Sequence, residues 1–269
     1  MGENLLGDYL RARRELVRPE EHGLPDLGRR RVPGLRREEV AMLAGISAEY
    51  YVRLERGRDR NPSVQVLDAL SRVLGLDEES RTYLASLAGA PAPARPTVET
   101  VPRAVQALVA GTRGPAFVLG RFMDVLASNA AADLLHHGLP DNVVRHVFLD
   151  PAARTVYPDW DDVAAETVAS LRASVAGHLD DARLTRLVGE LSLKSAEFRT
   201  LWARQDVRAK TSGRKRVHSP EIGEVTVHWE ALQVASAPGQ VVVTYFAEPG
   251  TESQTRLDRL NRKAADARS

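Results

Sequence analysis

Apolar positions in residues 5–88 recur three and four residues apart, which predicts a series of short helices. Leu6 and Tyr9, for example, fall on one helix face. Ser63 and Asp77 each precede a further apolar run, and serine and aspartate are preferred at helix N-caps. The first third of the chain is therefore predicted to be an all-α domain.

The pattern changes in the second half of the chain. Residues 115–128 alternate between apolar and polar well enough for two short strands that turn near Gly120. Residues 161–203 return to helical spacing, and residues 224–235 and 240–249 are rich in β-forming residues on either side of a Pro-Gly turn. Strands, then helices, then strands predict an α+β domain with an antiparallel sheet.

These patterns suggest a division of the chain into four parts. Residues 1–90 form the helical domain, and residues 91–103 form an Ala/Pro-rich linker that we expect to be extended and semi-rigid. Residues 104–250 form the α+β domain. Residues 251–269 are a polar tail, expected to be a frayed helix or disordered.

The segment from Arg37 to Arg56 has the features of a helix-turn-helix. Ala41 is small enough to let two helices cross closely, Gly45 stands where the chain must turn with positive φ, and Ser47 can cap the second helix. The face predicted to point inward contains Val40, Ile46, Tyr51 and Leu54. An ordinary helical hairpin would show much of the same pattern, so the motif alone does not decide between the two.

Charge adds support for a nucleic-acid-binding surface. The net charge is only +1, but residues 27–37 contain five arginines and no acidic residue. Residues 53–60 contain four arginines against two acidic residues. Basic charge gathered in short stretches is typical of DNA-binding surfaces, although a solvated face would look the same.

Several other classes of protein are disfavoured. The chain has no cysteine, which excludes disulfides and thiolate chemistry. Its charged first residues do not resemble a signal peptide and no apolar run is long enough to span a membrane, so we expect a cytoplasmic, nucleoid-associated protein. The sequence lacks the common catalytic motifs, and its histidines lack metal-ligand spacing. We expect no enzymatic activity, no metal and no cofactor other than a possible bound ligand.

Longer motifs resemble a known family. The segments LRARR (10–14), EEVAMLAGIS (38–47), RLERG (53–57) and VLDALSRVLGL (66–76) resemble the lambda-repressor-like, Xre-type domain. The long stretch between the first two helices resembles a narrower group, the MmyB-like regulators of actinomycete type. Further segments support that resemblance: PGLRREEVAMLAG, YYVRLERGRDRNPS, LGRFMDVLASN, FLDPAARTVYPDW, GELSLKSAEFRTLWARQDVR and FAEPG.

The resemblance implies several features of fold and function. It implies that Arg14 pairs with Glu55 as a structural contact, not as a contact to DNA. It also implies a PAS-like C-terminal domain, similar to sensory domains, that holds a fatty-acid-like ligand.

The helix-turn-helix pattern and the arginines suggest candidate DNA contacts. Arg53 is the best candidate for base contact, because arginine can bind guanine with two hydrogen bonds. Glu49 could accept a hydrogen bond from cytosine or only order Arg53. The side chains expected to contact phosphates are those of Ser47, Arg36, Arg37, Arg56, Arg58 and Arg60. Ala48 and Val52 complete the outward face, and Arg29, Arg30 and Arg31 could follow phosphates, enter a minor groove or be solvated.

Candidate ligand contacts are less specific. The apolar and aromatic candidates are Phe117, Leu119, Phe148, Trp160, Trp202, Trp229 and Tyr245, for which plain core packing is the alternative. The polar candidates for holding a head group are Asn129, Arg145, Arg208 and His218. An arginine could hold a carboxylate, whereas Asn129 could instead cap a helix.

Taken together, these features predict a sequence-specific transcription regulator that binds double-stranded DNA as a homodimer on a roughly palindromic operator. Its C-terminal domain would sense a small apolar ligand. In one alternative the C-terminal half only dimerises or recruits a protein partner. In another it is an enzyme, which would require a polar, titratable cluster in a cleft.

Overall fold

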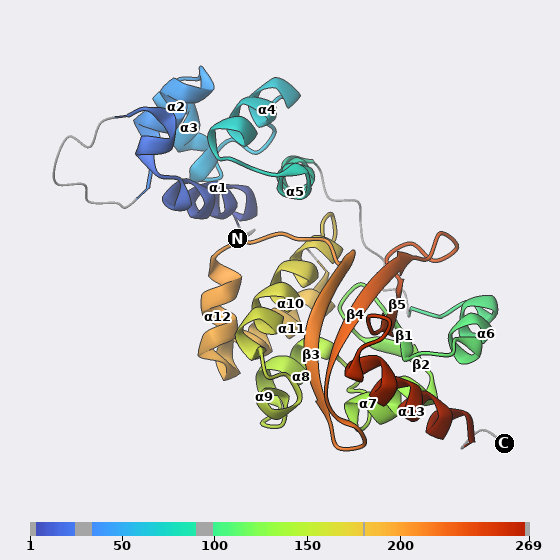
Figure 1. The fold of residues 1–269 in the computed structure, drawn as a ribbon. Helices are drawn as coiled ribbons and strands as arrows, with labels where there is room; N and C mark the ends of the chain where they lie inside the picture. Colours follow the sequence, from blue (N-terminus) through green and yellow to red (C-terminus); the bar gives the residue numbers. More distant parts are fainter. Residues whose placement is uncertain (1–3, 25–33, 90–98, 180, 267–269) are drawn as a thin grey trace. The chain divides into compact units, whose positions relative to one another are not determined.

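A computed structural model describes residues 4–24, 34–89, 99–179 and 181–266 (Figure 1). Contacts between Cα atoms divide the chain into two compact units. The first unit comprises residues 1–94, 176–180 and 200–208, and the second comprises residues 95–175, 181–199 and 209–269.

The described residues of the N-terminal region fold into helices, and the predicted all-α fold is confirmed. The α-helices are α1 (Leu5–Leu16), α2 (Arg37–Ala44), α3 (Ala48–Glu55), α4 (Val64–Val73) and α5 (Glu78–Ala88), and a 3-10 helix spans Pro19–His22. The side chains of Ser63 and Asp77 cap α4 and α5, because they accept hydrogen bonds from the backbone N–H groups of Val66 and Ser80.

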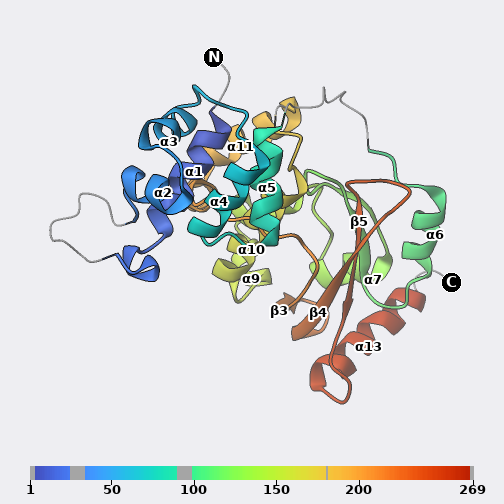
Figure 2. The ribbon, with the colours of Figure 1, turned by 90° about the horizontal axis from the view of Figure 1, so that it is seen from above.

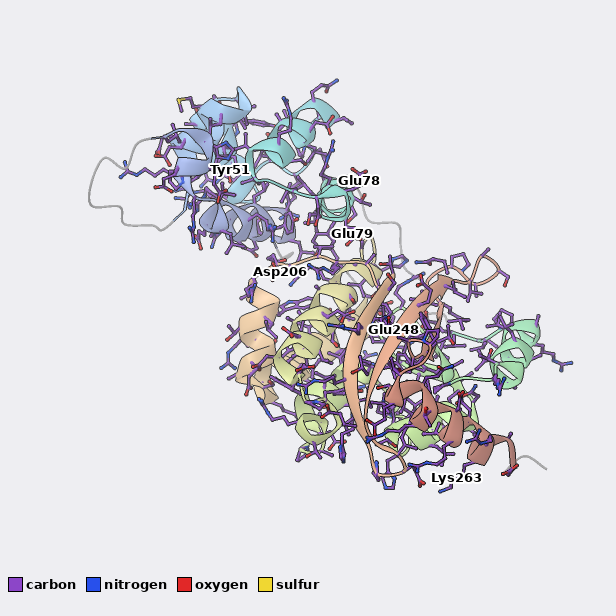
Figure 3. All side chains as sticks on the ribbon, viewed as in Figure 1. Tyr51, Glu78, Glu79, Asp206, Glu248 and Lys263 are labelled. Atoms are coloured by element: carbon purple, nitrogen blue, oxygen red, sulfur yellow. The ribbon has the colours of Figure 1, made fainter. Side chains whose placement is uncertain are left out.

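Buried tyrosines form the centre of this helical region. Tyr51 on α3 is completely buried and lies among α1, α2 and α3 (Figure 3). Tyr9 on α1 and Tyr83 on α5 pack edge to face with ring centroids 5.2 Å apart, and the Tyr9 hydroxyl donates to the Ser80 carbonyl. Because each ring removes about 150–250 Å² from water, these aromatic contacts contribute much of the packing between α1, α3 and α5.

The second unit is built on an antiparallel sheet, as predicted for an α+β fold. Its strands are β1 (Ala116–Leu119), β2 (Val125–Ser128), β3 (Ser212–Ser219), β4 (Gly223–Gln233) and β5 (Val241–Phe246). In the described residues their order is β2-β1-β5-β4-β3. Four of these strands fall in the segments predicted from β-forming residues.

The strand β3 is missing from the sequence prediction. It has the sequence SGRKRVHS, with three consecutive basic residues and a single large apolar one, yet its exposure alternates with a period of two. It lies at the edge of the sheet and pairs with β4 alone. Edge strands often contain charged residues, so the low apolar content hides the period-two pattern.

Helices lie on both sides of this sheet. The helices of the second unit are α6 (Arg103–Gly111), α7 (Ala130–His136), α8 (Val143–Leu149), α9 (Ala153–Val156), α10 (Trp160–Ser174), α11 (Ala182–Lys194) and α13 (Glu252–Asp266), and α12 (Ala196–Ala203) spans the boundary between the two units in the sequence. The helical spacing predicted for residues 161–203 corresponds to α10, α11 and α12. Two views show α6 on one side of the sheet and α9 and α10 on the other (Figures 1 and 2).

Strand register assigns side chains to the two faces of the sheet. Val118 is opposite Val242, and both pack with Val109 of α6 in one buried cluster. Residues one position along face the other way, because successive side chains of a strand alternate. Phe117, Leu119, Trp229 and Tyr245 therefore share the opposite face, here called the inner face.

The C-terminal segment differs from the predicted polar tail. Helix α13 is regular through Asp266, and its Leu257, Leu260 and Ala264 are buried. The Ser253 hydroxyl at its start accepts a hydrogen bond from the backbone N–H of Thr226 in β4. Three apolar positions suffice to bury one face of α13, while its other positions are polar enough to resemble a tail in the sequence.

No helix in the described parts of the chain has the length and apolar character needed to cross a membrane.

Candidate functional site

The turn between α2 and α3 has the geometry of a helix-turn-helix. Gly45 ends α2 with φ +68°, a left-handed conformation that glycine adopts without strain. Ser47 then caps α3, since its Oγ accepts from the backbone N–H of Tyr50 at 3.1 Å. Tyr51 and Leu54 are fully buried, as predicted for the inward face of α3.

The opposite face of α3 is open to solvent. Ser47, Ala48 and Glu49 are exposed, and Val52 is half-buried. The side chain of Arg53 is 43% exposed; its guanidinium lies 5.4 Å from the Tyr50 ring centroid and 3.5 Å from a Glu49 carboxylate oxygen. Glu49 and Tyr50 thus lie close enough to Arg53 to order it, while a contact of Glu49 with cytosine stays a prediction.

Further arginines surround this face. Arg36 precedes α2, and Arg56, Arg58 and Arg60 follow α3; all four are exposed. The Arg60 Nε donates to the Gly57 carbonyl at 3.1 Å. The predicted contacts Arg29, Arg30 and Arg31 lie outside the described residues.

Arg37 has a structural partner that the sequence did not predict. Its Nε lies 2.6 Å from Glu55 Oε2, while the Nε of Arg14 lies 2.6 Å from Glu55 Oε1. The buried Glu55 carboxylate therefore joins two arginines, of which Arg14 is also buried. A phosphate contact by Arg37 stays a prediction, and it would compete with this ion pair.

Arg14 also fixes the chain that returns to α2. Its Nη1 donates to the Leu35 carbonyl at 2.8 Å, and the Leu35 N–H donates to the Arg14 carbonyl at 3.2 Å. Gly34 packs so closely on α1 that an added Cβ would lie 2.4 Å from the Arg14 carbonyl oxygen. Only a glycine fits there without a backbone shift.

The predicted apolar ligand contacts separate into groups. Phe117, Leu119, Trp229 and Tyr245 lie together on the inner face of the sheet, and all four are buried. Phe148 and Trp160 pack edge to face 5.7 Å apart, and the Trp160 Nε1 donates to the Val147 carbonyl. Trp202 on α12 is half-buried and belongs to residues 200–208, which group with the first compact unit.

The predicted polar anchor Asn129 is fully occupied by the protein. Its side-chain NH₂ donates to the carbonyls of Val109, Thr112 and Gly114, and its Oδ1 accepts from the N–H groups of Ala116 and Ala132. Asn129 is thus the N-cap of α7 and joins α6, β1 and α7. The structure gives it the capping role that the sequence left open, with no hydrogen-bonding group left over for a ligand.

The other predicted anchors are solvent-exposed. Arg208 and His218 are exposed, and Arg145 is ion-paired with Glu190 at 2.9 Å. Arg145 borders a pocket of about 180 Å³ with Arg183 and Arg186. Arg183 is itself held by Asp124 at 2.7 Å, so two of the three arginines have protein partners.

Several buried titratable groups near the inner face were not predicted as binding residues. Burial, with Lys215 and His146 nearby, holds the pKa of His136 well below its usual value. Burial also raises the pKa of Tyr157 to about 12 and lowers that of Lys210 to about 8. Lys215 lies among basic residues of β3 whose alternation is visible only in their exposure, so no sequence signal places it here.

Family comparisons agree with both parts of this architecture. Residues 5–84 match the model of a helix-turn-helix domain, and residues 101–260 match that of the MmyB-like transcription regulator ligand binding domain. The protein is thus a DNA-binding transcription regulator with a ligand-binding domain. More specifically, the chain belongs to the MmyB-like transcription regulator family. Both matching families are those of regulators, not of enzymes.

Comparisons with solved structures and with curated proteins do not change this family assignment. One solved structure, described as that of an RNA-binding light-oxygen-voltage receptor, is similar over 86% of this chain at 9% identity, with a TM-score of 0.26. The chain spans 56% of that protein's length. No curated protein matches the chain.

Proposed function

We propose that this regulator recognises DNA through α3, with Arg53 contacting a base pair, and that its C-terminal domain senses a small apolar, fatty-acid-like molecule. The observation that best supports DNA contact is the exposure of Ser47, Ala48 and Glu49 at the start of α3, opposite buried Tyr51 and Leu54. The N-terminal residues of a recognition helix are those that contact base edges in the major groove.

Two copies of this chain would place two recognition helices in successive major grooves, about 34–36 Å apart. A ligand can favour one arrangement of these helices only if it binds that arrangement more tightly. We therefore propose a homodimer whose affinity for its operator changes with ligand occupancy.

Replacement of Arg53 by alanine tests the DNA contact. Because a two-hydrogen-bond arginine–guanine contact supplies both affinity and base preference, Arg53→Ala is expected to cost about 1–3 kcal/mol at the preferred site and to relax one base position. The measurement is selection of bound duplexes from a random pool, followed by titration at fixed salt.

Arg58→Ala provides the matched control, because Arg58 is exposed and is expected to contact phosphate. This variant should lower the affinity for all duplex sequences similarly and reduce the salt dependence of binding, without changing base preference. Unchanged base preference in Arg53→Ala would show that Arg53 does not contact the bases.

The ligand proposal is tested by mass spectrometry of the purified full-length chain under native conditions. The inner face presents Phe117, Leu119 and Tyr245 to the covering helices, an apolar environment suited to an acyl chain. We expect a bound small molecule whose mass is lost on denaturation, and the same spectrum gives the oligomeric state.

A dimer with no bound molecule and no affinity for added dodecanoate would favour the alternative in which this domain only associates with protein. Exposed Leu232 of β4 and Phe246 of β5, on the side of the sheet opposite the inner face, would then be candidate contacts. The Arg53→Ala variant should retain its ligand, since it alters only the DNA-binding face.

A further inference from the structure

The inner face of the sheet holds a positive charge without a protein counter-ion. Lys215 on β3 is half-buried, and its ammonium nitrogen lies 5.1 Å from the ring centroid of Tyr157 and 4.9 Å from that of Tyr245. These rings attract the cation through their faces. In the described chain, no carboxylate forms an ion pair with Lys215.

A second lysine at this face has a carboxylate counter-ion. Lys210 lies over the Trp229 ring, 3.8 Å from its centroid, and its ammonium is also 3.8 Å from a Glu166 carboxylate oxygen. Among these three side chains, the two lysines and one glutamate carry one net positive charge. That remaining charge is assigned to Lys215.

An unsatisfied histidine lies beside Lys215. His136, at the end of α7, is only 6% exposed, and neither of its ring nitrogens has a hydrogen-bond partner in the structure. Its ring centroid is 5.7 Å from that of Tyr245 and 6.3 Å from those of Phe117 and Tyr157. Burial keeps the pKa of this imidazole low, so the ring is neutral and has one N–H to donate.

Unpaired groups of this kind destabilise the folded state unless a ligand supplies the missing partners. A buried polar atom without a hydrogen bond costs free energy, and a half-buried cation without a counter-ion adds to that cost. Trp229 adds another case, because its Nε1 is also buried without a partner. A single negative charge with oxygen acceptors between β3 and α7 would satisfy both the ammonium and an imidazole N–H.

We propose that Lys215 and His136 form the anion-recognition end of the ligand site, and that they bind the carboxylate of an apolar acid. The inference rests on the proposed function, in which this domain holds an apolar ligand. One uncompensated charge matches a monoanion, whereas a dianion would leave excess negative charge among aromatic rings. Phe117 and Leu119 on the same face provide apolar surface for the rest of the ligand.

The test compares dodecanoate with dodecan-1-ol, which has the same chain but no charge. Binding is measured by calorimetry on the ligand-stripped full-length protein, below the micelle-forming concentration. Lys215→Met keeps most of the side-chain length and removes the charge. This variant is expected to lower the affinity for dodecanoate about 10- to 100-fold while changing the affinity for dodecanol less than about twofold. His136→Phe should lower the affinity for dodecanoate about 3- to 10-fold.

Arg214→Met is the matched control, because Arg214 precedes Lys215 on the same strand but is exposed on the opposite face. It should bind dodecanoate like the wild type. Thermal denaturation gives a second readout: removal of an uncompensated charge should leave Lys215→Met at least as stable as the wild type.

Three outcomes separate the possibilities. If dodecanoate and dodecanol bind equally, or if Lys215→Met binds dodecanoate like the wild type, the anion site is wrong and the apolar-ligand proposal stands. If neither compound binds to the wild type, both proposals fail. Selective loss of dodecanoate in Lys215→Met supports the anion site.

Discussion

Glu55→Ala is expected to lower the free energy of unfolding of the N-terminal helices by about 3–5 kcal/mol, the usual cost of removing one partner of a buried ion pair. Glu55 and Arg14 are both buried, and the carboxylate also holds Arg37 at 2.6 Å. Without the carboxylate, the Arg14 guanidinium keeps its hydrogen bond to the Leu35 carbonyl but loses its buried counter-ion, and only the exposed Glu15 carboxylate remains near it at 3.5 Å. Hydrogen exchange of amides in residues 5–88 measures the change.

Two further variants show whether the buried charge is responsible. Glu49→Ala removes an exposed glutamate from the same helix, whose pair with Arg53 should contribute no more than about 1 kcal/mol. The double variant Arg14→Met/Glu55→Met leaves no unpaired buried charge and should recover much of the lost stability. Equal exchange in Glu55→Ala and the wild type would contradict this account.

Asn129→Ala is expected to destabilise the C-terminal unit by about 3–4 kcal/mol, because several buried backbone groups lose their partner at once. The side chain of Asn129 serves three carbonyls and two N–H groups, and the residue is only 4% exposed. Chemical denaturation followed by the fluorescence of Trp160 and Trp229, both buried in this unit, measures the loss.

The neighbouring Ser128→Ala serves as the control for Asn129. The Ser128 hydroxyl donates to the Asp133 carboxylate in an exposed hydrogen bond, which should contribute about 0.5–1.5 kcal/mol at most. If Asn129→Ala and Ser128→Ala have similar stability, water must reach the orphaned groups and the junction between α6, β1 and α7 matters less than its hydrogen bonds suggest.

Local signals in the sequence predicted much of the N-terminal domain. Gly45 and Ser47 act within one turn of their own position, so the α2–α3 turn and the α3 cap follow from neighbouring residues. The ion pair between Arg37 and Glu55 links residues eighteen positions apart in the chain. No local pattern distinguishes such an arginine from its exposed neighbour Arg36.

The sequence predicted the α+β fold class of the C-terminal domain but did not predict all of its strands. The apolar strands β4 and β5 were recognisable, whereas β3 was not, because its inner positions include Gly213 and Lys215 instead of large apolar residues. The proposed anion site depends on that missed strand. The burial of His136 beside Tyr245 depends on contacts distant in sequence, so no local pattern indicates it.

The contacts between Arg14 and Leu35 also affect how much the length of the chain between α1 and α2 can vary. The chain leaves α1 after Leu16 and comes back to the end of the same helix at Gly34 and Leu35. Because the entropy of closing a loop grows only slowly with its length, added residues between these fixed ends should change the free energy of unfolding little as long as buried Val17 and Pro19 keep their places. The contacts of Arg14 with Leu35 and Gly34 should thus hold the start of α2 against α1 even in variants whose intervening chain differs in length.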